Sequence, residues 1–207
     1  RPGSPCCRSA APGRTIDAMP SLTARPANAI LFDRGVLTRV RPQDAADVIA
    51  AVAANADQLR DWIPWADVPE ARRAKAEGAE ADWEADRAYV YALRETPLGP
   101  VIGGLGAYRR VGPGAIELGY WLASEHVGRG LASAATAALA SVVSALPDIE
   151  RVELHIDEAN ARSVAVARRL GFRLARTDAY EPRTAAETGR LQIWVRAVEM
   201  EPGSPSA

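Results

Sequence analysis

The segment SEHVGRGLASAATAALA, residues 124–140, places two glycines and an arginine directly before an alanine-rich run. That run predicts a helix, and the first turn of a helix leaves backbone N–H groups unpaired at the positive end of its dipole. Glycine at such a turn lets an anion approach the backbone closely. Gly128 and Gly130 therefore predict a phosphate site that uses the N–H groups as far as Ser133, with added charge from Arg129. The alternative is a tight loop that only starts a helix.

Two common phosphate-binding motifs fit this segment poorly. A P-loop needs Gly-Lys-Ser/Thr at the helix start, and the segment does not contain that sequence. A dinucleotide fingerprint needs a strand that runs straight into the glycines and a third Gly or Ala. Here a short loop intervenes, and Ser133 holds the third place. The ligand has to be inferred from the rest of the chain.

The pattern of apolar and turn residues predicts a mixed α/β fold. The predicted strands are residues 35–41, 88–94, 100–110, 115–123, 151–157, 171–177 and 190–198, and the predicted helices are 42–55, 70–87, 131–146 and 160–170. Turn-rich segments separate the three strands between residues 88 and 123, which indicates an antiparallel meander. Pro147 stops the alanine-rich helix, and Gly171 closes the next helix at its C′ position.

The length of 207 residues predicts one domain, over residues 30–199. Residues 1–29 and 200–207 are rich in Pro, Gly and Ser, and we expect them to be disordered tails. We interpret the residues before Met19 as partly non-native, because this methionine would make a plausible start.

Composition excludes several classes of partner. Charged residues make up 25% of the chain and its net charge is −1, so no overall field favours nucleic acid or an anionic membrane. No apolar run approaches the ~20 residues that cross a bilayer. Cys6 and Cys7 are adjacent in the first tail, and no second Cys or His pair completes a zinc site, so we expect no metal. A core without cysteine fits a reducing cytosol, and we expect a cytoplasmic protein.

Two longer segments carry a family resemblance. IELGYWLASEHVGRGLASAATAAL, residues 116–139, followed by RVELHIDEANARSVAVARRLGFRL, residues 151–174, resembles the acyl-CoA-binding core of the GNAT acyltransferases. NADQLRDWIPWA, residues 55–66, is similar to the RimJ/RimL branch of ribosomal-protein N-terminal acetyltransferases, which carries a Trp-x-Pro-Trp-like turn. The resemblance covers residues 36–198. It implies a GNAT fold, with three α/β/α layers around a mixed, mostly antiparallel sheet that is splayed at its centre.

The resemblance implies that the glycine-rich helix start holds the pyrophosphate of coenzyme A. The family pattern Gln/Arg-x-x-Gly-x-Gly/Ala falls on Val127, Gly130 and Ala132, and Val127 departs from it. Asn160 matches the family asparagine that binds the pantetheine arm, and it is equally suited to cap a helix. The residues expected to bind CoA are Tyr120, Trp121, Leu122, Val127, Gly128, Arg129, Gly130, Leu131, Ala132, Ser133, Asn160 and Ser163.

Acyl transfer to an amine needs a neutral amine, a polarised thioester carbonyl and a proton for the departing thiolate. By resemblance, Glu117 holds the place of a catalytic glutamate on the central strand, and Glu181 is the rival base. The family tyrosine that acts as acid falls on Ala167, so that mechanism is not available from this helix. Ser163 matches the serine of the RimJ/RimL branch and can hydrogen-bond the thiolate; its other role is small-residue packing.

Aromatic residues suggest where the acceptor binds. Trp62 and Trp65, in a loop between helices, are the expected wall of the acceptor site, although core packing is equally natural for one of them. Tyr180, in the segment before the last strand, is expected on the substrate side as well. The sequence predicts that Trp83, Trp121 and Trp194 belong to the core. His126 and His155 are interpreted as structural.

The reaction that the resemblance implies is transfer of an acetyl group from acetyl-CoA to a primary amine, without metal or covalent intermediate. A protein N-terminal α-amine is the expected acceptor. The alternatives are a small amine, such as an aminoglycoside or polyamine, and a non-catalytic acyl-CoA-binding module. The expected partners are therefore a CoA thioester and an amine acceptor, with no nucleic acid and no membrane. A homodimer is common in such families.

Overall fold

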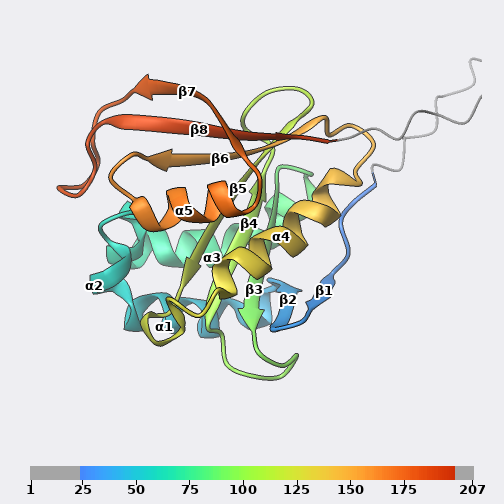
Figure 1. Ribbon diagram of the computed structural model, residues 1–207. Coiled ribbons are helices and arrows are strands. Elements are labelled where there is room, and N and C mark those ends of the chain that lie inside the picture. Colours follow the sequence, from blue (N-terminus) through green and yellow to red (C-terminus); the bar gives the residue numbers. More distant parts are fainter. Residues whose placement is uncertain (1–23, 199–207) are drawn as a thin grey trace, which may run out of the picture.

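Eight strands and five helices make up residues 24–198, the part of the chain that the computed structural model describes (Figure 1). In chain order they are β1 (Ala29–Phe32), β2 (Gly35–Arg39), α1 (Ala45–Ala54), α2 (Ala56–Leu59), α3 (Pro69–Glu84), β3 (Ala88–Arg94), β4 (Gly103–Tyr108), β5 (Ala115–Leu122), α4 (Leu131–Ser144), β6 (Arg151–Asp157), α5 (Ala161–Arg169), β7 (Arg173–Ala179) and β8 (Arg190–Ala197). Short 3-10 turns cover Pro42–Asp44, Pro64–Asp67 and Ser124–His126.

The strands form one sheet in the order β1-β2-β3-β4-β5-β6-β8-β7. Neighbouring strands are antiparallel, except that β5 and β6 are parallel. A parallel pair needs a long crossover connection, and here α4 supplies it. The prediction of a mixed, mostly antiparallel sheet with a meander in its middle is therefore confirmed.

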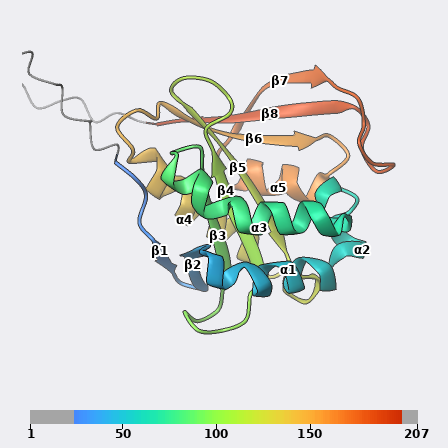
Figure 2. The same ribbon diagram turned by 180° about the vertical axis from the view of Figure 1, so that it is seen from behind.

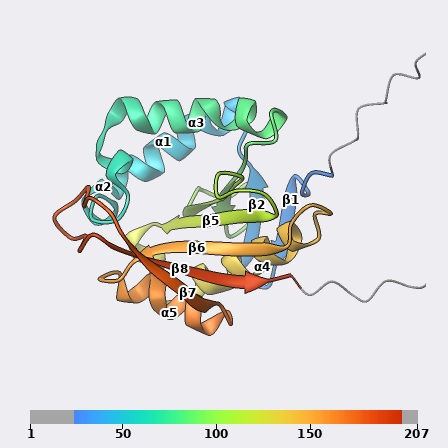
Figure 3. The same ribbon diagram turned by 90° about the horizontal axis from the view of Figure 1, so that it is seen from above.

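Helices cover both faces of this sheet. Figure 3 shows α1 and α3 on one side and α4 and α5 on the other, with the strands between them. Seen from behind, α3 and α1 run side by side across the face of the sheet (Figure 2). The predicted three-layer arrangement is confirmed.

Side chains of β5 alternate between the two layers, as the period of two in a strand requires. Ile116, Leu118 and Leu122 belong to the larger core cluster, to which α4 contributes Leu139. Trp121 points the other way and joins a smaller cluster with residues of α1 and α2. Glu117 and Gly119 lie on the same face as Trp121. This alternation places the acidic residue of β5 on the α1–α3 side of the sheet.

Local sequence sets the ends of α5. The Asn160 side chain accepts a hydrogen bond of 3.1 Å from the Ser163 N–H, which satisfies one free donor of the first turn. Gly171 follows the helix with φ +76°, the left-handed conformation that closes helices and that glycine adopts without strain. Both features were predicted from the sequence.

Two differences from the sequence analysis concern the first half of the chain. β1 was missed, because it is a four-residue edge strand that pairs only with β2 across a tight hairpin. The helix expected over 42–55 begins instead as a 3-10 turn, and α1 starts at Ala45. The expected tails lie largely outside the described residues. Within residues 24–198, no helix combines the length and apolar character needed to cross a membrane.

Candidate active site

A cavity of about 1800 Å³ opens where β5 and β6 part. The two strands pair at only three positions, of which Glu117 opposite Glu153 is the last. Beyond this point β5 stays paired with β4, and β6 stays paired with β8. The sheet is therefore open at its centre, as the sequence analysis predicted. Residues from both faces of the sheet line the cavity.

The glycine-rich turn lies at the α4 side of this cavity. Gly128 and Gly130 have φ angles of +82° and +75°, in the left-handed region that side chains disfavour. Gly130 is the N-cap residue of α4, and no side chain caps this helix start. A Cβ atom on Gly128 would meet nothing within 4 Å, so the space beside the turn is open. The first turn of α4 is therefore available to an anion from the cavity.

Arginines from distant parts of the chain surround the same turn. Arg34, in the turn between β1 and β2, donates a hydrogen bond to the carbonyl of Arg129. Arg169, in the last turn of α5, donates a hydrogen bond of 2.8 Å to the Ser133 hydroxyl. Both arginines line the cavity. The sequence analysis named Arg129 and missed the other two, because only the tertiary fold brings them to this place.

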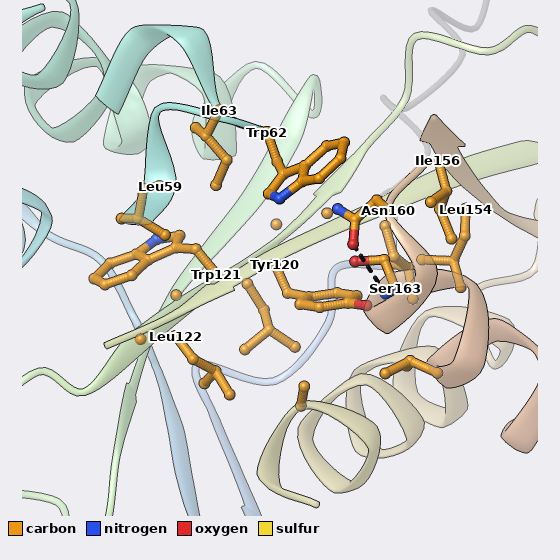
Figure 4. Close-up of a pocket in the computed structure, with 18 of the residues that line it drawn as sticks. Leu59, Trp62, Ile63, Tyr120, Trp121, Leu122, Leu154, Ile156, Asn160 and Ser163 are labelled. Carbon is orange, nitrogen blue, oxygen red and sulfur yellow. Dashed lines mark hydrogen bonds between the residues drawn. The ribbon is translucent and has the colours of Figure 1, made fainter. Parts of the chain in front are cut away.

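Tyr120, Asn160 and Ser163 meet on the α5 side of the cavity (Figure 4). The side-chain oxygen of Asn160 accepts a hydrogen bond from the Ser163 N–H, so the side-chain NH₂ group of Asn160 remains able to donate. The Tyr120 hydroxyl is directed toward Ser163 in Figure 4, yet its oxygen is buried and forms no hydrogen bond within the described residues. Burial raises the pKa of Tyr120.

Glu117 is buried on the opposite side of the sheet and is held by Arg110. The guanidinium donates two hydrogen bonds, of 2.7 and 2.6 Å, one to each oxygen of the carboxylate. These bonds raise the pKa of Arg110. The Arg110 side chain also lies over the ring of Tyr108, with its guanidinium carbon 4.6 Å from the ring centre. Bidentate pairing of this kind gives a carboxylate a fixed orientation.

Glu153 and His155 lie on the same face of β6, next to Glu117. His155 Nε2 is 2.7 Å from Glu153 Oε2, and Arg151 Nε donates a 2.8 Å hydrogen bond to the other Glu153 oxygen. The second imidazole nitrogen, Nδ1, lies 3.9 Å from Glu117 Oε2. Burial raises the pKa of Glu153, but the hydrogen bonds from His155 and Arg151 outweigh it, and the pKa lies below its ordinary value. The structure therefore brings one imidazole between two carboxylates.

Trp62 and Trp65 both line the cavity on the α1–α3 side, but they differ in their surroundings. Trp65 packs against the smaller core cluster, to which Trp121 belongs, whereas Trp62 is not part of either cluster. In Figure 4, Trp62 lies across the cavity from Tyr120. The prediction that Trp83, Trp121 and Trp194 belong to the core is confirmed, since each is at most 9% exposed.

The segment between β7 and β8 closes one end of the cavity. Tyr180 lines the cavity, and its hydroxyl donates a 3.0 Å hydrogen bond to the buried carboxylate of Asp157. Thr188 donates to the same carboxylate through its N–H and its hydroxyl. Thr184 donates a 2.7 Å hydrogen bond to the carbonyl of Asp61, just before Trp62. This segment is thereby tied both to the end of β6 and to the tryptophan loop.

The predicted site residues mostly come together. All the residues expected to bind CoA line the cavity, as do Glu117, Trp62, Trp65 and Tyr180. Glu181 is exposed and does not line it. Its assignment as a base, like the other residue roles, stays a prediction. Within residues 24–198, no group of three or more His, Cys, Asp or Glu side chains is arranged to hold a metal ion.

Comparison with known proteins gives consistent matches. The family described as "Acetyltransferase (GNAT) domain" matches residues 34–173. The "Putative ribosomal N-acetyltransferase YdaF" of Bacillus subtilis is 27% identical over 137 residues, which are 64% of this chain and 74% of that protein.

Solved structures share the fold at low sequence identity. RimL, an α-N-acetyltransferase of ribosomal protein L7/L12 solved with coenzyme A, has a TM-score of 0.72 at 22% identity, covering 82% of this chain and 98% of that one. RimJ of Mycobacterium smegmatis, solved with CoA-disulfide, has a TM-score of 0.69 at 22% identity, covering 85% and 88%.

Proposed function

Because the chain belongs to the GNAT family of acetyltransferases, we propose that it transfers the acetyl group of acetyl-CoA to the α-amine of a protein N-terminus. The observation that carries the proposal is the gap between β5 and β6. An uncapped, arginine-rich helix start lies on one side of this gap, and a cluster of carboxylates and one imidazole lies on the other. A thioester bound on the first side can meet an amine that enters from the second.

The α4 side fits the CoA half of the reaction. A pyrophosphate carries the charge that the first-turn N–H groups and the arginines Arg34, Arg129 and Arg169 favour. Beyond Glu117 the edge of β5 that faces the gap has no strand partner, and an extended pantetheine arm can add to this edge as a strand would. The Asn160 amide is free to donate to a pantetheine carbonyl.

The leaving thiolate needs a proton or a hydrogen bond. The proposal assigns this role to Ser163, supported by Tyr120 on the facing strand. The Tyr120 hydroxyl is buried without a hydrogen-bond partner among the described residues, and an unpaired buried polar group costs stability unless a ligand satisfies it. Both hydroxyls lie on the CoA side of the gap, where a sulfur leaving group would emerge.

The acceptor is proposed to be an α-amine for a chemical reason and a comparative one. An α-amine has a pKa near ~8, whereas a lysine side chain has one near ~10.4, so far more of the α-amine is neutral at physiological pH. The names of two similar solved proteins describe acetylation at the N-terminus of ribosomal protein L7/L12. Such an acceptor is made in the cytoplasm, which is where we propose that the protein acts.

The first test of this proposal is ligand binding. We expect CoA and acetyl-CoA, but neither NAD nor ATP, to raise the midpoint of thermal unfolding by several degrees. A ligand at 100 times its dissociation constant adds about 2.7 kcal/mol to the free energy of unfolding. Stabilisation by NAD alone, or by none of the four ligands, contradicts the proposed pyrophosphate site.

The second test compares acceptors in an assay of CoA thiol release. One peptide has a free α-amine and no lysine, and a matched peptide has an acetylated α-amine and one lysine. A polyamine and an aminoglycoside form the third set. We expect transfer to the free α-amine peptide at least tenfold faster than to the others. Faster transfer to a small amine contradicts the protein acceptor, and CoA binding without any transfer contradicts the enzyme.

A further inference from the structure

We propose that His155, oriented by Glu153, takes the proton from the attacking amine through its Nδ1 atom, directly or through one water. This role rests on the proposed function, because it needs an amine to be acetylated. The resemblance to other acetyltransferases directs attention to glutamates. The geometry of the β5–β6 gap points instead to the imidazole.

The hydrogen bond to Glu153 selects the tautomer of His155. A carboxylate accepts hydrogen bonds and does not donate them, so the contact of 2.7 Å to Glu153 Oε2 requires the proton on Nε2. In the neutral imidazole, Nδ1 then carries the lone pair. A carboxylate that holds one imidazole nitrogen and leaves the other free is the arrangement that makes histidine a base in hydrolases.

Neighbouring groups fix the position of the Glu153 carboxylate that orients His155. It is 4% exposed, and its second oxygen accepts a hydrogen bond from Arg151, so the carboxylate cannot rotate away from the imidazole. Two strands fix its backbone, since Glu153 pairs with Glu117 on β5 and with Val195 on β8. We therefore treat Glu153 as a positioning residue and His155 as the residue that meets the amine.

Glu117 is a weaker candidate for the base because Arg110 occupies both of its oxygens. A proton arriving on this carboxylate would remove the negative charge that strengthens its two short hydrogen bonds from Arg110. The position of Glu117 suits a different task. Its Oε2 lies 3.9 Å from His155 Nδ1, so its negative charge stabilises the imidazolium that forms when Nδ1 takes a proton.

His155 is placed where the chemistry is proposed to occur. It lies two residues beyond Glu153, which is the last residue of β6 that pairs with β5. It also lines the cavity, and its side chain remains 19% exposed. The imidazole is therefore in the open part of the gap, on the side from which an amine would enter, and it is reachable by a small group or a water molecule.

The charged groups around His155 come from several elements. Glu117 faces it from β5, with Arg110 behind it, and Glu153 and Arg151 lie on the same face of β6. Asp157 follows on that face, and the residue of β8 opposite His155 is Ile193. Ionisable side chains from the facing α3 and from the β7–β8 segment line the same cavity, namely Arg72, Lys75, Asp82, Tyr180, Arg183 and Glu187.

Each acetyl transfer moves one proton from the amine to His155 and one proton from solvent to the sulfur. The amine nitrogen forms a bond to the acyl carbon, and one proton passes from that nitrogen to His155 Nδ1. The carbon–sulfur bond then breaks, and the sulfur leaves as a thiolate that gains a proton from solvent by way of Ser163. The imidazolium returns its proton to solvent. The net products are an amide and the free CoA thiol.

The test is the pH profile of acetyl transfer to an α-amine peptide, measured for the wild type and three variants. His155→Gln removes the titrating group, Glu153→Gln removes the orienting charge, and Glu117→Gln tests the competing base. His126→Gln is the matched control, because His126 is the other of the two histidines in the chain and does not line the cavity. A CoA-induced shift in the unfolding temperature verifies that each variant is folded and binds CoA. The rates are measured at saturating acetyl-CoA, so that each variant carries its acetyl donor.

We expect kcat of the wild type to rise with pH through a single inflection and then level off. His155→Gln should lower kcat at pH 7 about 100-fold, which is within the usual effect of a general base. Its profile should lack the inflection and keep rising toward pH 9, because solvent hydroxide then removes the proton. Glu153→Gln should shift the inflection to lower pH, and His126→Gln should leave the profile unchanged.

Other results overturn the proposal. A His155→Gln profile parallel to that of the wild type at every pH indicates a structural role, and loss of the inflection in Glu117→Gln alone makes Glu117 the base. If His155→Gln fails to fold, the titration of His155 followed by NMR in the wild type replaces it, and a midpoint different from the kinetic inflection rejects the proposal. A wild type that acetylates no α-amine contradicts the proposed function itself, whereas an active wild type with an unaffected variant contradicts only the role of His155.

Discussion

Glu117 and Glu153 lie opposite each other at the last paired position of β5 and β6, and each carboxylate is held by its own arginine. Like charges directly opposite each other destabilise a sheet. Arg110 and Arg151 supply the compensating charge, so the two glutamates persist at the point where the strands part. Like charges that are kept at opposite positions in a sheet break a local rule of stability, and such departures are typical of functional sites.

The glycine turn can be tested with a matched pair of substitutions. Gly128 and Gly112 both have positive φ angles, +82° and +100°, and open space where a Cβ would lie, but only Gly128 lines the cavity. Gly128→Ala and Gly112→Ala should each lower the free energy of unfolding by about 1–2 kcal/mol. Only Gly128→Ala should weaken CoA binding, by at least tenfold, as measured by calorimetry. Equal CoA affinity in the two variants would mean that the turn does not hold the ligand.

Asn160 has two roles that substitutions can separate. Asn160→Ala should lower the free energy of unfolding by about 1 kcal/mol, because α5 loses its N-cap. Asn160→Asp keeps an oxygen that accepts from the Ser163 N–H, and it should therefore retain the stability. Both variants lose the amide donor and should raise the KM for acetyl-CoA several-fold. An unchanged KM in Asn160→Asp shows that the amide does not contact the cofactor arm.

Tyr120→Phe should have opposite effects on stability and on rate. The hydroxyl is buried without a partner among the described residues, so removing it should leave the free energy of unfolding unchanged or raise it by about 1 kcal/mol. The same change should lower kcat about tenfold if the hydroxyl assists Ser163 at the thiolate. The two quantities are measured by denaturant unfolding and by thiol release. Full activity in Tyr120→Phe leaves Ser163 as the only proposed donor.

The two loop tryptophans should respond differently to truncation. Trp65→Ala removes a ring that packs against the smaller core cluster and should cost about 3 kcal/mol of unfolding free energy. Trp62→Ala should cost less than 1 kcal/mol but raise the KM for the peptide acceptor, with the KM for acetyl-CoA unchanged. Each variant is the control for the other. A higher acceptor KM in Trp65→Ala than in Trp62→Ala would reverse the assignment.

From the surroundings of Asp157 we predict that the folded protein loses stability in acid. Burial raises the pKa of Asp157, but the hydrogen bonds from Ala159, Tyr180 and Thr188 outweigh it, so its pKa lies below the ordinary value of about 3.9. Its contribution is therefore full above that value and disappears as the pH falls through the folded-state pKa.

Asp157→Asn is the variant that tests this contribution. It should lower the free energy of unfolding at pH 7 by about 1–3 kcal/mol, with a difference from the wild type that shrinks below about pH 4. Asp178→Asn, in an exposed pair with Arg176, is the control and should change little. Denaturant unfolding measured from pH 2.5 to pH 7 checks both variants. A difference that is constant over this range contradicts the assignment.

Local pattern was sufficient for much of the fold. The limits of β3 and β6 were predicted to the residue, because AYVYALR is a mostly apolar run and RVELHID alternates polar and apolar residues. The capping of α5 followed from Asn160 and Gly171, whose side-chain chemistry and backbone freedom act within a single turn. By contrast, β1 is stabilised by its pairing with β2 rather than by its own composition, and the sequence analysis missed it.

The candidate site divides in the same way. The helix start at Gly128 and Gly130 is a local feature, so a turn without side-chain bulk could be predicted there from residue type. The resemblance directed attention to Glu117, but its pairing with Arg110 depends on the turn that joins β4 to β5. The sequence shows that Glu117 can ionise, but it does not show which residue neutralises its charge.

The sequence by itself determined most of the helices and strands, and it determined that one helix begins on bare backbone. The reason is that hydrophobic period, capping and glycine conformation act over a few residues. Only the tertiary structure decided that Arg34 and Arg169 reach the start of α4, and that His155 lies between Glu153 and Glu117. The position of His155 follows from the parting of the two parallel strands β5 and β6. Their register sets which side chains meet across the gap, and register is a property of the assembled sheet rather than of either strand.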